Sequence, residues 1–411
     1  MAIVKPFCCV RPAASVADQV AALPYDVYNR KEACRAVAGH PLSFLNIDRP
    51  ETQFDESVDT YADCVYDRAR QLLDARMADG TFVKDAVSCY YIYELTMNGR
   101  VQTGIAACSS VDDYLNQIIR KHENTRADKE LDRIRHVDAC DAQTGPIFLA
   151  YRSRKGINDL IAVAKMEDPL YDFTSEDGVR HAVWRISDSN TVRDLEHEFE
   201  QVPNTYIADG HHRAASAVKV AVMRREQHPG YDGSEPFNYF LSVLFPDDQL
   251  MIMPYNRVVK DLNGLTEEEF LAAVGGKFTV ERLGAVPYQP AKKAEFGLYL
   301  SNSWYRLTAG DGILSRDPVE GLDVSILQNH LLGPILGIED PRVDKRIDFI
   351  GGIRGLGELE RRVGEDMKAA FSMYPTSIAE LFSVADAGLL MPPKSTWFEP
   401  KLRSGLFIHI L

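Results

Sequence analysis

Eight consecutive residues, Tyr206–Arg213, place several groups that bind phosphate well at one reversal of the chain. The first three predict a short buried strand, Asp209-Gly210 predicts a turn, and an alanine-rich stretch to about residue 225 predicts a helix. The N-terminus of a helix attracts anions through its unpaired N–H groups and its dipole. The basic triplet His211-His212-Arg213 adds donors there, and an arginine fork matches phosphate geometry. This octet therefore predicts a phosphate-type ligand.

In the alternative interpretation, Asp209 caps the helix and the basic triplet is only a solvated first turn. Positive side chains are disfavoured at the positive end of a helix dipole, so three in a row favour a bound anion. A transition-metal site made of Asp209, His122 and the two adjacent histidines is a further alternative, but neighbouring side chains on a helix point in different directions. Magnesium held by Asp209 or Glu123 together with nucleotide phosphates fits these residues more easily.

The tetrapeptide His122-Glu123-Asn124-Thr125 and the charged residues after it form a second polar cluster. Its last residues can cap the following helix, on which Lys129 and Arg133 would lie one turn apart on one face. In the functional interpretation the tetrapeptide meets the octet, and Glu123 is a base or a metal ligand. The alternative is a capped, exposed helix of mixed charge.

Two further segments are candidates for ligand contact. Pro392–Thr396 presents Lys394 and two hydroxyls on a rigid loop, which is compatible with phosphate contact although the loop lacks the glycines of a P-loop. In the alternative, this loop is structural and is pinned by Trp397 and its neighbour. Ser43, Asp48 and Arg49, which flank the apolar segment Phe44–Ile47, are candidates for facing a pocket.

The composition is that of an ordinary globular protein with an acidic surface. The 411 residues carry a formal net charge of −14 without a lysine- or arginine-rich run, which argues against nonspecific binding to DNA or to an anionic membrane. No apolar run approaches the roughly 18 residues that span a membrane, and the N-terminus lacks the apolar core of a signal peptide. The seven cysteines contain no CxxC pair, so neither a zinc ribbon nor a disulfide framework is predicted. We therefore expect a cytoplasmic protein with reduced cysteines.

Helix-type and strand-type patterns alternate along the chain, which predicts a mixed α/β (α+β) fold. We expect an N-terminal domain of residues 1–257, which contains the octet, and a C-terminal α+β domain of residues 258–411. Asn98-Gly99 between two apolar runs predicts a hairpin, and Val111–His122 has a helical pattern. The patterns of capping boxes, which open helices, are found at Thr266–Glu269 and Ser377–Glu380.

The octet resembles the phosphate-binding motif of the ParB/sulfiredoxin superfamily, and its Asp-Gly-His-His-Arg sequence is similar to that of the free-serine kinases. The whole chain also resembles a widespread bacterial and archaeal family of unknown function that is often labelled ParB-like. The stretches that carry this wider resemblance are Leu23–Val27, Ser43–Leu45, His122–Thr125, the octet and Met391–Phe398. The superfamily resemblance is confined to the octet and its flanks.

The resemblance implies a ParB/sulfiredoxin-like core that binds nucleotide phosphates through the basic triplet. Sulfiredoxins have a cysteine before His-Arg, and His211 stands in the place of that cysteine, which removes the sulfinic-acid reductase chemistry. ParB proteins couple a cytidine nucleotide to DNA binding, but the acidic charge and the lack of a basic stripe argue against that activity here. The serine kinases carry a catalytic glutamate upstream of the motif, and Glu123 is the candidate for that position.

We therefore expect a small-molecule phosphotransferase that uses ADP or ATP with magnesium on a hydroxylated metabolite such as serine. A non-catalytic nucleotide sensor is the main alternative, followed by a CTP-dependent protein associated with DNA. The expected partners are the nucleotide and a small-molecule substrate, without a membrane, and a homo-oligomer is left open. The expected roles are catalysis by Glu123, Asp209 and His211; metal binding by Asp209 and Glu123; nucleotide binding by Gly210, His211, His212, Arg213, His122 and Lys394; and substrate binding by Lys129, Arg133, Ser395 and Thr396.

Overall fold

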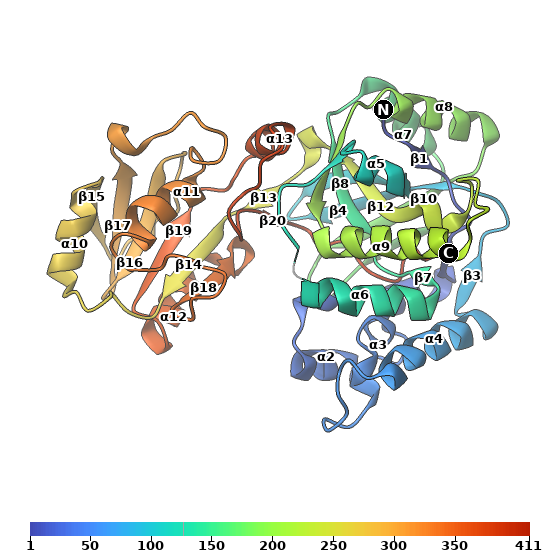
Figure 1. Ribbon diagram of the computed structural model, residues 1–411, viewed down its shortest axis with the longest axis horizontal. Coiled ribbons are helices and arrows are strands. Elements are labelled where there is room, and N and C mark those ends of the chain that lie inside the picture. The colour runs from blue at the N-terminus through green and yellow to red at the C-terminus, as the bar shows by residue number, and fades with distance from the viewer. Residues whose placement is uncertain (126) are drawn as a thin grey trace. The chain divides into compact units, whose positions relative to one another are not determined.

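The computed structural model describes residues 1–125 and 127–411 and divides into two compact units (Figure 1). The first unit contains Met1–Leu250 together with the C-terminal tail Pro400–Leu411, and the second contains Met251–Glu399. The second unit thus begins shortly before the boundary expected at residue 258, and the tail returns to the first unit. A division into folding domains 1–257 and 258–411 stays a prediction.

The first unit is built on a large mixed sheet. Within the described residues the sheet has nine strands, in the order β6 (Ile119–Arg120), β11 (Thr205–Asp209), β8 (Ile147–Tyr151), β12 (Tyr239–Pro246), β5 (Arg100–Ser110), β4 (Tyr90–Met97), β10 (Arg180–Ile186) and β9 (Tyr171–Thr174), with β1 (Val4–Lys5) paired to β5. The pairs β6–β11 and β8–β12 are parallel, and the other neighbours are antiparallel. The mixed α/β fold class expected from the sequence is confirmed.

Several helices share one apolar core with this sheet. They are α5 (Val111–Leu115), α7 (Lys155–Ala164), α8 (Ser189–Glu200) and α9 (His211–Gln227). Figure 1 shows α9 running across the strands. It contributes mainly small side chains, including Ala214, Ala217 and Ala221, to this core. Small residues let a helix approach a sheet closely, and α9 packs against β8 and β12.

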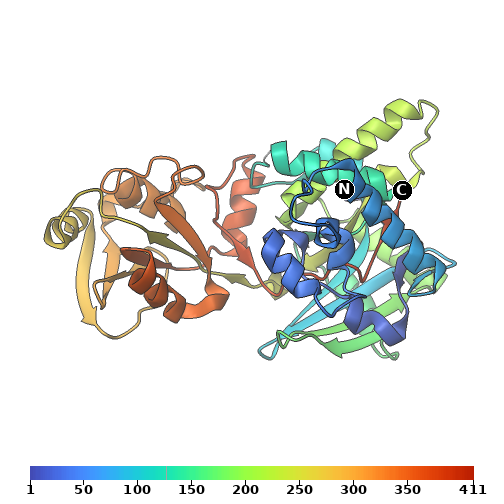
Figure 2. The ribbon, with the colours of Figure 1, turned by 90° about the horizontal axis from the view of Figure 1, so that it is seen from below.

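A second group of helices surrounds its own apolar core in the same unit. It contains α1 (Ala17–Val20), α2 (Arg30–Val37), α3 (Leu45–Asp48), α4 (Asp63–Ala78) and α6 (Ala127–Cys140), with the strand pair β2 (Val10–Pro12) and β3 (Phe82–Lys84). The blue helices of Figure 2 are the N-terminal members of this group. Helix α6 packs against both α4 and α9, so it connects the second group to the start of α9.

The C-terminal tail crosses the face of the sheet opposite α9. Phe407 packs against Tyr91 and Tyr93 of β4, and β21 (His409–Ile410) pairs with β7 (Ala142–Gln143). This path brings Lys401 and Ser404 to the octet and to the pocket described below.

Two local predictions in this unit have different outcomes. The hairpin between β4 and β5 is confirmed, with Asn98 and Gly99 at φ 52° and 78°, values typical of a two-residue hairpin turn. The helix predicted over 111–122 is wrong beyond Leu115: Gln117 takes φ 59°, which ends the helix, and the chain then extends as β6 to pair with β11. Non-local strand pairing overrides the local helical pattern there.

The second unit is built on a smaller antiparallel sheet. In the described part of the chain this sheet has six strands, in the order β15 (Phe278–Gly284), β17 (Ser303–Ala309), β16 (Glu295–Leu300), β19 (Ala369–Met373), β14 (Tyr255–Val259) and β18 (Ile347–Gly351). The same unit contains α10 (Glu267–Gly275), α11 (Asp323–Leu327), α12 (Gly355–Glu365), α13 (Ile378–Asp386) and the pair β13 (Ile252–Met253) and β20 (Trp397–Phe398). Both predicted capping boxes are confirmed, at the starts of α10 and α13.

Two further observations concern the length of the described helices and the state of the cysteines. None of the described helices combines the length and the apolar run that crossing a bilayer requires. All seven cysteines are free thiols. Burial raises the pKa of the Cys140 thiol to about 12, so this buried thiol is protonated and unreactive near neutral pH.

Candidate functional site

The octet folds as the end of β11, a sharp turn and the first turn of α9. The pairing of β11 with β8 shifts register between Ile207 and Asp209, and such a bulge re-aims the chain at the end of a strand. Gly210 then takes φ 92°, a left-handed conformation that glycine adopts without steric cost. A Cβ at this position would lie 3.1 Å from Nε of Arg213. The strand, turn and helix that the sequence predicts are therefore present.

Asp209 does not cap α9. Within the described residues no side chain caps this helix, whose N-cap is Gly210. The Asp209 Oδ1 atom accepts a hydrogen bond from the Gly210 N–H at 2.8 Å, and Oδ2 accepts one from Lys401 Nζ at 2.9 Å. Burial opposes ionisation of Asp209, but the Lys401 ammonium and the Arg213 guanidinium outweigh it and hold the pKa of this carboxyl well below its usual range. Lys401 thus neutralises Asp209.

His122 lies beside His211 because β6 and β11 are parallel. Arg120 pairs with Tyr206, so the residues that follow the two strands leave the sheet at the same edge. The two imidazole rings have centroids 4.6 Å apart and stand perpendicular. His122 is only 2% exposed and His211 only 7%. Within the described residues, Nε2 of His211 has no hydrogen-bond partner, and the His122 ring nitrogens make no more than a weak contact with the backbone of Ile207.

Burial keeps both imidazoles neutral near neutral pH. It lowers the pKa of His122 to about 4, and burial together with the neighbouring His122 ring lowers the pKa of His211 well below its ordinary value. Glu123 Oε2 lies 4.0 Å from Nδ1 of His211, and the Glu123 side chain is 43% exposed. The fold thus brings His122, Glu123 and His211 into one cluster at the start of α9.

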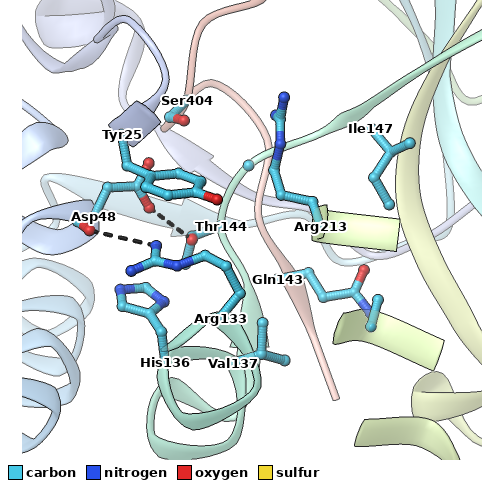
Figure 3. A pocket seen from close by; sticks show the side chains of 12 residues that line it. Tyr25, Asp48, Arg133, His136, Val137, Gln143, Thr144, Ile147, Arg213 and Ser404 are labelled. Carbon is cyan, nitrogen blue, oxygen red and sulfur yellow. Dashed lines mark hydrogen bonds between the residues drawn. The ribbon is translucent and has the colours of Figure 1, made fainter. Parts of the chain in front are cut away.

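Arg213 lines a pocket (Figure 3). Its Nη1 donates a hydrogen bond to the carbonyl oxygen of Pro146 at 2.5 Å. Its Nε is buried and has no hydrogen-bond partner in the described part of the chain. The polar side chains that line the pocket include Tyr25, Asp48, Arg133, Thr144, Arg213 and Ser404.

Arg133 of α6 is the second arginine in this pocket. Its guanidinium carbon lies 4.0 Å from the centre of the Tyr25 ring, and the guanidinium pairs with Asp132 at 2.9 Å. Figure 3 shows it beside Asp48 and Thr144: Arg133 Nη1 donates to the Asp48 carbonyl at 3.5 Å, and the Thr144 hydroxyl donates to Asp48 Oδ1 at 2.9 Å. Burial raises the pKa of Tyr25 to about 12, so its hydroxyl stays protonated.

The size and charge of the pocket limit what it can hold. Its volume is about 30 Å³, which is room for about two water molecules. The charged groups among its lining residues are two guanidiniums, from Arg133 and Arg213, and the carboxylate of Asp48. In this conformation the pocket suits a small anionic group such as a carboxylate, whereas a whole nucleotide is too large for it.

Five other predicted residues do not line this pocket. Lys129 is exposed on α6 and is not among the residues that line the pocket. His212 is half-buried and contributes to lowering the pKa of Glu130. The remaining three residues, Lys394, Ser395 and Thr396, belong to the second unit. There Lys394 Nζ lies 5.5 Å from the centre of the Tyr255 ring, and buried Ser395 donates to the carbonyl of Pro392 at 2.6 Å. The roles expected for all five predicted residues stay predictions.

Reasoning from the sequence misses three residues near the octet: Lys401, Tyr25 and Ser404. Lys401 and Ser404 come from the tail, where no motif marks them. For Tyr25 a signal is present, because Leu23–Val27 is one of the stretches that carry the wider family resemblance. Of the three residues that the sequence marks as candidates for facing a pocket, Asp48 lines it, whereas Ser43 and Arg49 are not among its lining residues.

A family model described as protein of unknown function DUF1015 matches residues 4–325. The chain belongs to this family. The wider resemblance to a family of unknown function is therefore confirmed, while the resemblance to the ParB/sulfiredoxin superfamily stays a prediction. Among curated proteins, none matches this DUF1015 chain.

Several solved structures resemble the DUF1015 chain at low identity. A free serine kinase in complex with AMP is 14% identical, with a TM-score of 0.34 over 74% of this chain and 91% of that chain. SbnI with C-terminal truncation from Staphylococcus aureus is 10% identical, with a TM-score of 0.38 over 74% of this chain and 87% of that chain. A conserved hypothetical protein from Pyrococcus furiosus is 14% identical, with a TM-score of 0.33 over 75% of this chain and 95% of that chain. TM-scores this low leave the function of the DUF1015 chain to be argued from its own residues.

Proposed function

We propose that this protein is a small-molecule phosphotransferase that binds ADP or ATP with a divalent metal ion and transfers phosphate to a hydroxylated metabolite such as serine. The observation that carries the proposal is the buried Nε of Arg213 at the start of α9, which lacks a hydrogen-bond partner in the described residues. Buried polar groups in native proteins are nearly always satisfied, so such a nitrogen points to a ligand.

The start of α9 supports phosphate binding in two ways. The helix has no side-chain cap within the described residues, so its first N–H groups and its dipole favour an anion. The Arg213 side chain extends from the first turn of the same helix and approaches the Gly210 turn closely. Guanidinium and backbone donors fixed in this way neutralise the charge that develops on a phosphoryl group during transfer.

The pocket beside Arg213 supports a second, smaller anionic group. Arg133 is held there by Asp132, which accepts from its Nε and Nη2, and by the ring of Tyr25, so its guanidinium supplies a fixed positive charge that attracts an anion. The pocket volume of about 30 Å³ fits that group alone. We therefore assign the carboxylate of an amino-acid acceptor to this pocket, with its hydroxyl directed toward the nucleotide.

The transfer exchanges one bond for another at the terminal phosphorus. The acceptor oxygen forms a bond to this phosphorus, while the bond from the phosphorus to the bridging oxygen of ADP or ATP breaks. The shortened nucleotide leaves with that electron pair, and the proton of the acceptor hydroxyl passes to solvent water. Of the two predicted carboxylates, Asp209 is engaged by Lys401, so Glu123 is the better candidate for holding the metal.

Two measurements test the proposal. The protein is incubated with nucleotide, divalent metal ion and a panel of hydroxylated amino acids, and ³¹P NMR follows the appearance of a phosphate monoester. Calorimetry compares nucleotide binding by Arg213→Ala with that by Arg193→Ala, which removes the same charge from an exposed position of α8. We expect Arg213→Ala to abolish binding and Arg193→Ala to leave it unchanged. Equal affinity of the two variants would overturn the site, and binding without transfer to any acceptor would instead indicate a nucleotide sensor.

A further inference from the structure

The cluster at the start of α9 has the composition of a metal site. One ligating atom from each of His122, Glu123 and His211 can be chosen so that all three lie within 4.8 Å of one another. The three residues come from two separate segments, the loop after β6 and the first turn of α9. Two facing histidines on different segments can ligate one ion, which the adjacent pair within α9 could do only awkwardly.

The surroundings of the two imidazoles indicate that a ligand belongs there. Both rings are buried, Nε2 of His211 has no hydrogen-bond partner in the described residues, and the His122 ring makes no more than a weak contact with the backbone of Ile207. Leaving a buried polar atom unpaired is destabilising, and a purely structural pair of histidines would be expected to bond to backbone or side chains. A metal ion satisfies such nitrogens directly, because neutral imidazole is among the commonest metal ligands in proteins.

We propose that His122, Glu123 and His211 hold a divalent transition-metal ion, of the class that includes zinc and cobalt. Two imidazoles and one carboxylate are a donor set for these ions, and three protein ligands leave a position open for water or for a phosphate oxygen. Magnesium fits this set poorly, because it prefers oxygen ligands only. The other predicted magnesium ligand, Asp209, is bound to Lys401 at 2.9 Å.

The ligating atoms of the cluster lie slightly farther apart than the ligands of a bound ion, so small movements of the side chains would bring them into coordination distance. Atoms about 2.1 Å from a tetrahedral zinc ion lie about 3.4 Å from one another. The distance from His211 Nδ1 to Glu123 Oε2 is 4.0 Å. The Glu123 side chain is 43% exposed, so rotation about its own bonds can bring the carboxylate closer without repacking of the core.

This assignment goes beyond the proposed phosphate transfer and does not depend on it. Metal binding at the cluster would persist if the protein transferred no phosphate, and the Arg213→Ala test of nucleotide binding uses a residue outside the cluster. The two proposals therefore fail separately. If both hold, the ion would lie beside the start of α9, where the phosphate is expected.

Cobalt titration of the whole protein tests the site, because bound cobalt has a visible absorption spectrum that reports its ligands. The chain is stripped of metal with a chelator and titrated with Co²⁺, and competition with Zn²⁺ and Mg²⁺ follows. We expect one equivalent of Co²⁺ to bind with the intense visible bands of a tetrahedral or five-coordinate site. We also expect Zn²⁺ to displace it and Mg²⁺ to leave it in place.

Variants separate this cluster from ordinary histidine–carboxylate pairs. Glu123→Gln alters a half-exposed side chain and should weaken Co²⁺ binding about tenfold or more, and His211→Gln should abolish it. His197→Gln is the matched control. His197 Nδ1 lies 3.5 Å from Glu200 on the exposed face of α8, and no third ligand joins this pair in the described residues. This variant should bind Co²⁺ as the unmodified protein does. Circular dichroism checks that each variant is folded. The assignment is overturned if the unmodified protein binds no stoichiometric Co²⁺ or Zn²⁺, or if Glu123→Gln binds as tightly as His197→Gln.

Discussion

Lys401 and Asp209, 192 positions apart in the chain, form an ion pair of 2.9 Å beside the first turn of α9. The pair fastens the C-terminal tail to the reversal between β11 and α9. It also fixes the Asp209 carboxylate, which in turn accepts the N–H of Gly210. One contact made by the tail thus holds the turn from which His211 and Arg213 project.

Removing Lys401 should destabilise this turn. The two side chains are 17% and 29% exposed, so Lys401→Met leaves a largely buried carboxylate without its cation. We expect the free energy of unfolding to fall by about 1–3 kcal/mol in urea denaturation. Lys155→Met is the control, because Lys155 pairs with Asp159 while both are mostly exposed, and it should cost about 0.5 kcal/mol or less. Equal effects of the two variants would show that the tail does not secure the turn.

Gly210→Ala should harm both folding and ligand binding. Gly210 has φ 92°, and an added Cβ would lie 3.1 Å from Arg213 Nε. The backbone strain alone should lower the free energy of unfolding by about 1–2 kcal/mol. Gly80→Ala has a similar φ of 82° with no atom near the added Cβ, so it measures the strain without the contact. Thermal unfolding should show that both variants are destabilised. Calorimetry should show that only Gly210→Ala loses affinity for nucleotide, and retained affinity would count against Arg213 as a ligand.

Arg133→Lys should separate acceptor binding from nucleotide binding. Lysine keeps the charge but lacks the planar fork and stacks less well on the Tyr25 ring, which lies 4.0 Å from the Arg133 guanidinium carbon. We expect the KM for the acceptor to rise about tenfold, equivalent to about 1.4 kcal/mol, while nucleotide affinity stays the same. Steady-state kinetics with Arg193→Lys as the exposed control measures this split. An unchanged KM would mean that the acceptor does not use this pocket.

Asp323 in the second unit should give the stability a distinct pH dependence. Burial raises the pKa of Asp323 to about 7, although the Ala294 N–H, at 3.0 and 3.1 Å from its two oxygens, opposes the shift. The folded state then holds a proton that the unfolded state, with a pKa of about 3.9, has already lost. The contribution of Asp323 to stability is therefore largest below pH about 4 and falls as the pH rises to about 7, by at most about 1.4 kcal/mol per pH unit.

Comparison with Asp323→Asn isolates this contribution. Asparagine keeps an acceptor for the Ala294 N–H but has no proton to lose, so the fall between pH 4 and 7 should be absent from the variant. Denaturant unfolding at a series of pH values gives the difference between the two proteins. A difference that stays constant over this range would show that Asp323 titrates normally.

Some features of the fold follow from short stretches of sequence. Asn98-Gly99 specifies its hairpin because both residues accept positive φ, and Thr266 with Glu269 specifies the start of α10 because each side chain bonds the backbone of the other. The helical pattern of 111–122 fails where it competes with sheet formation. Beyond Gln117 the chain gains strand pairing with β11, and a local pattern carries no information about that partner.

The sequence by itself determined the strand, the glycine turn and the alanine-rich helix of the octet, because each depends on residues a few positions apart. It also indicated which residue types there favour an anion. Only the tertiary structure decided that His122 and Glu123 meet His211, that Arg133 shares a pocket with Arg213, and that Lys401 neutralises Asp209. These contacts join segments far apart in the chain, and they form because parallel strand pairing and helix packing close long loops that no local pattern encodes.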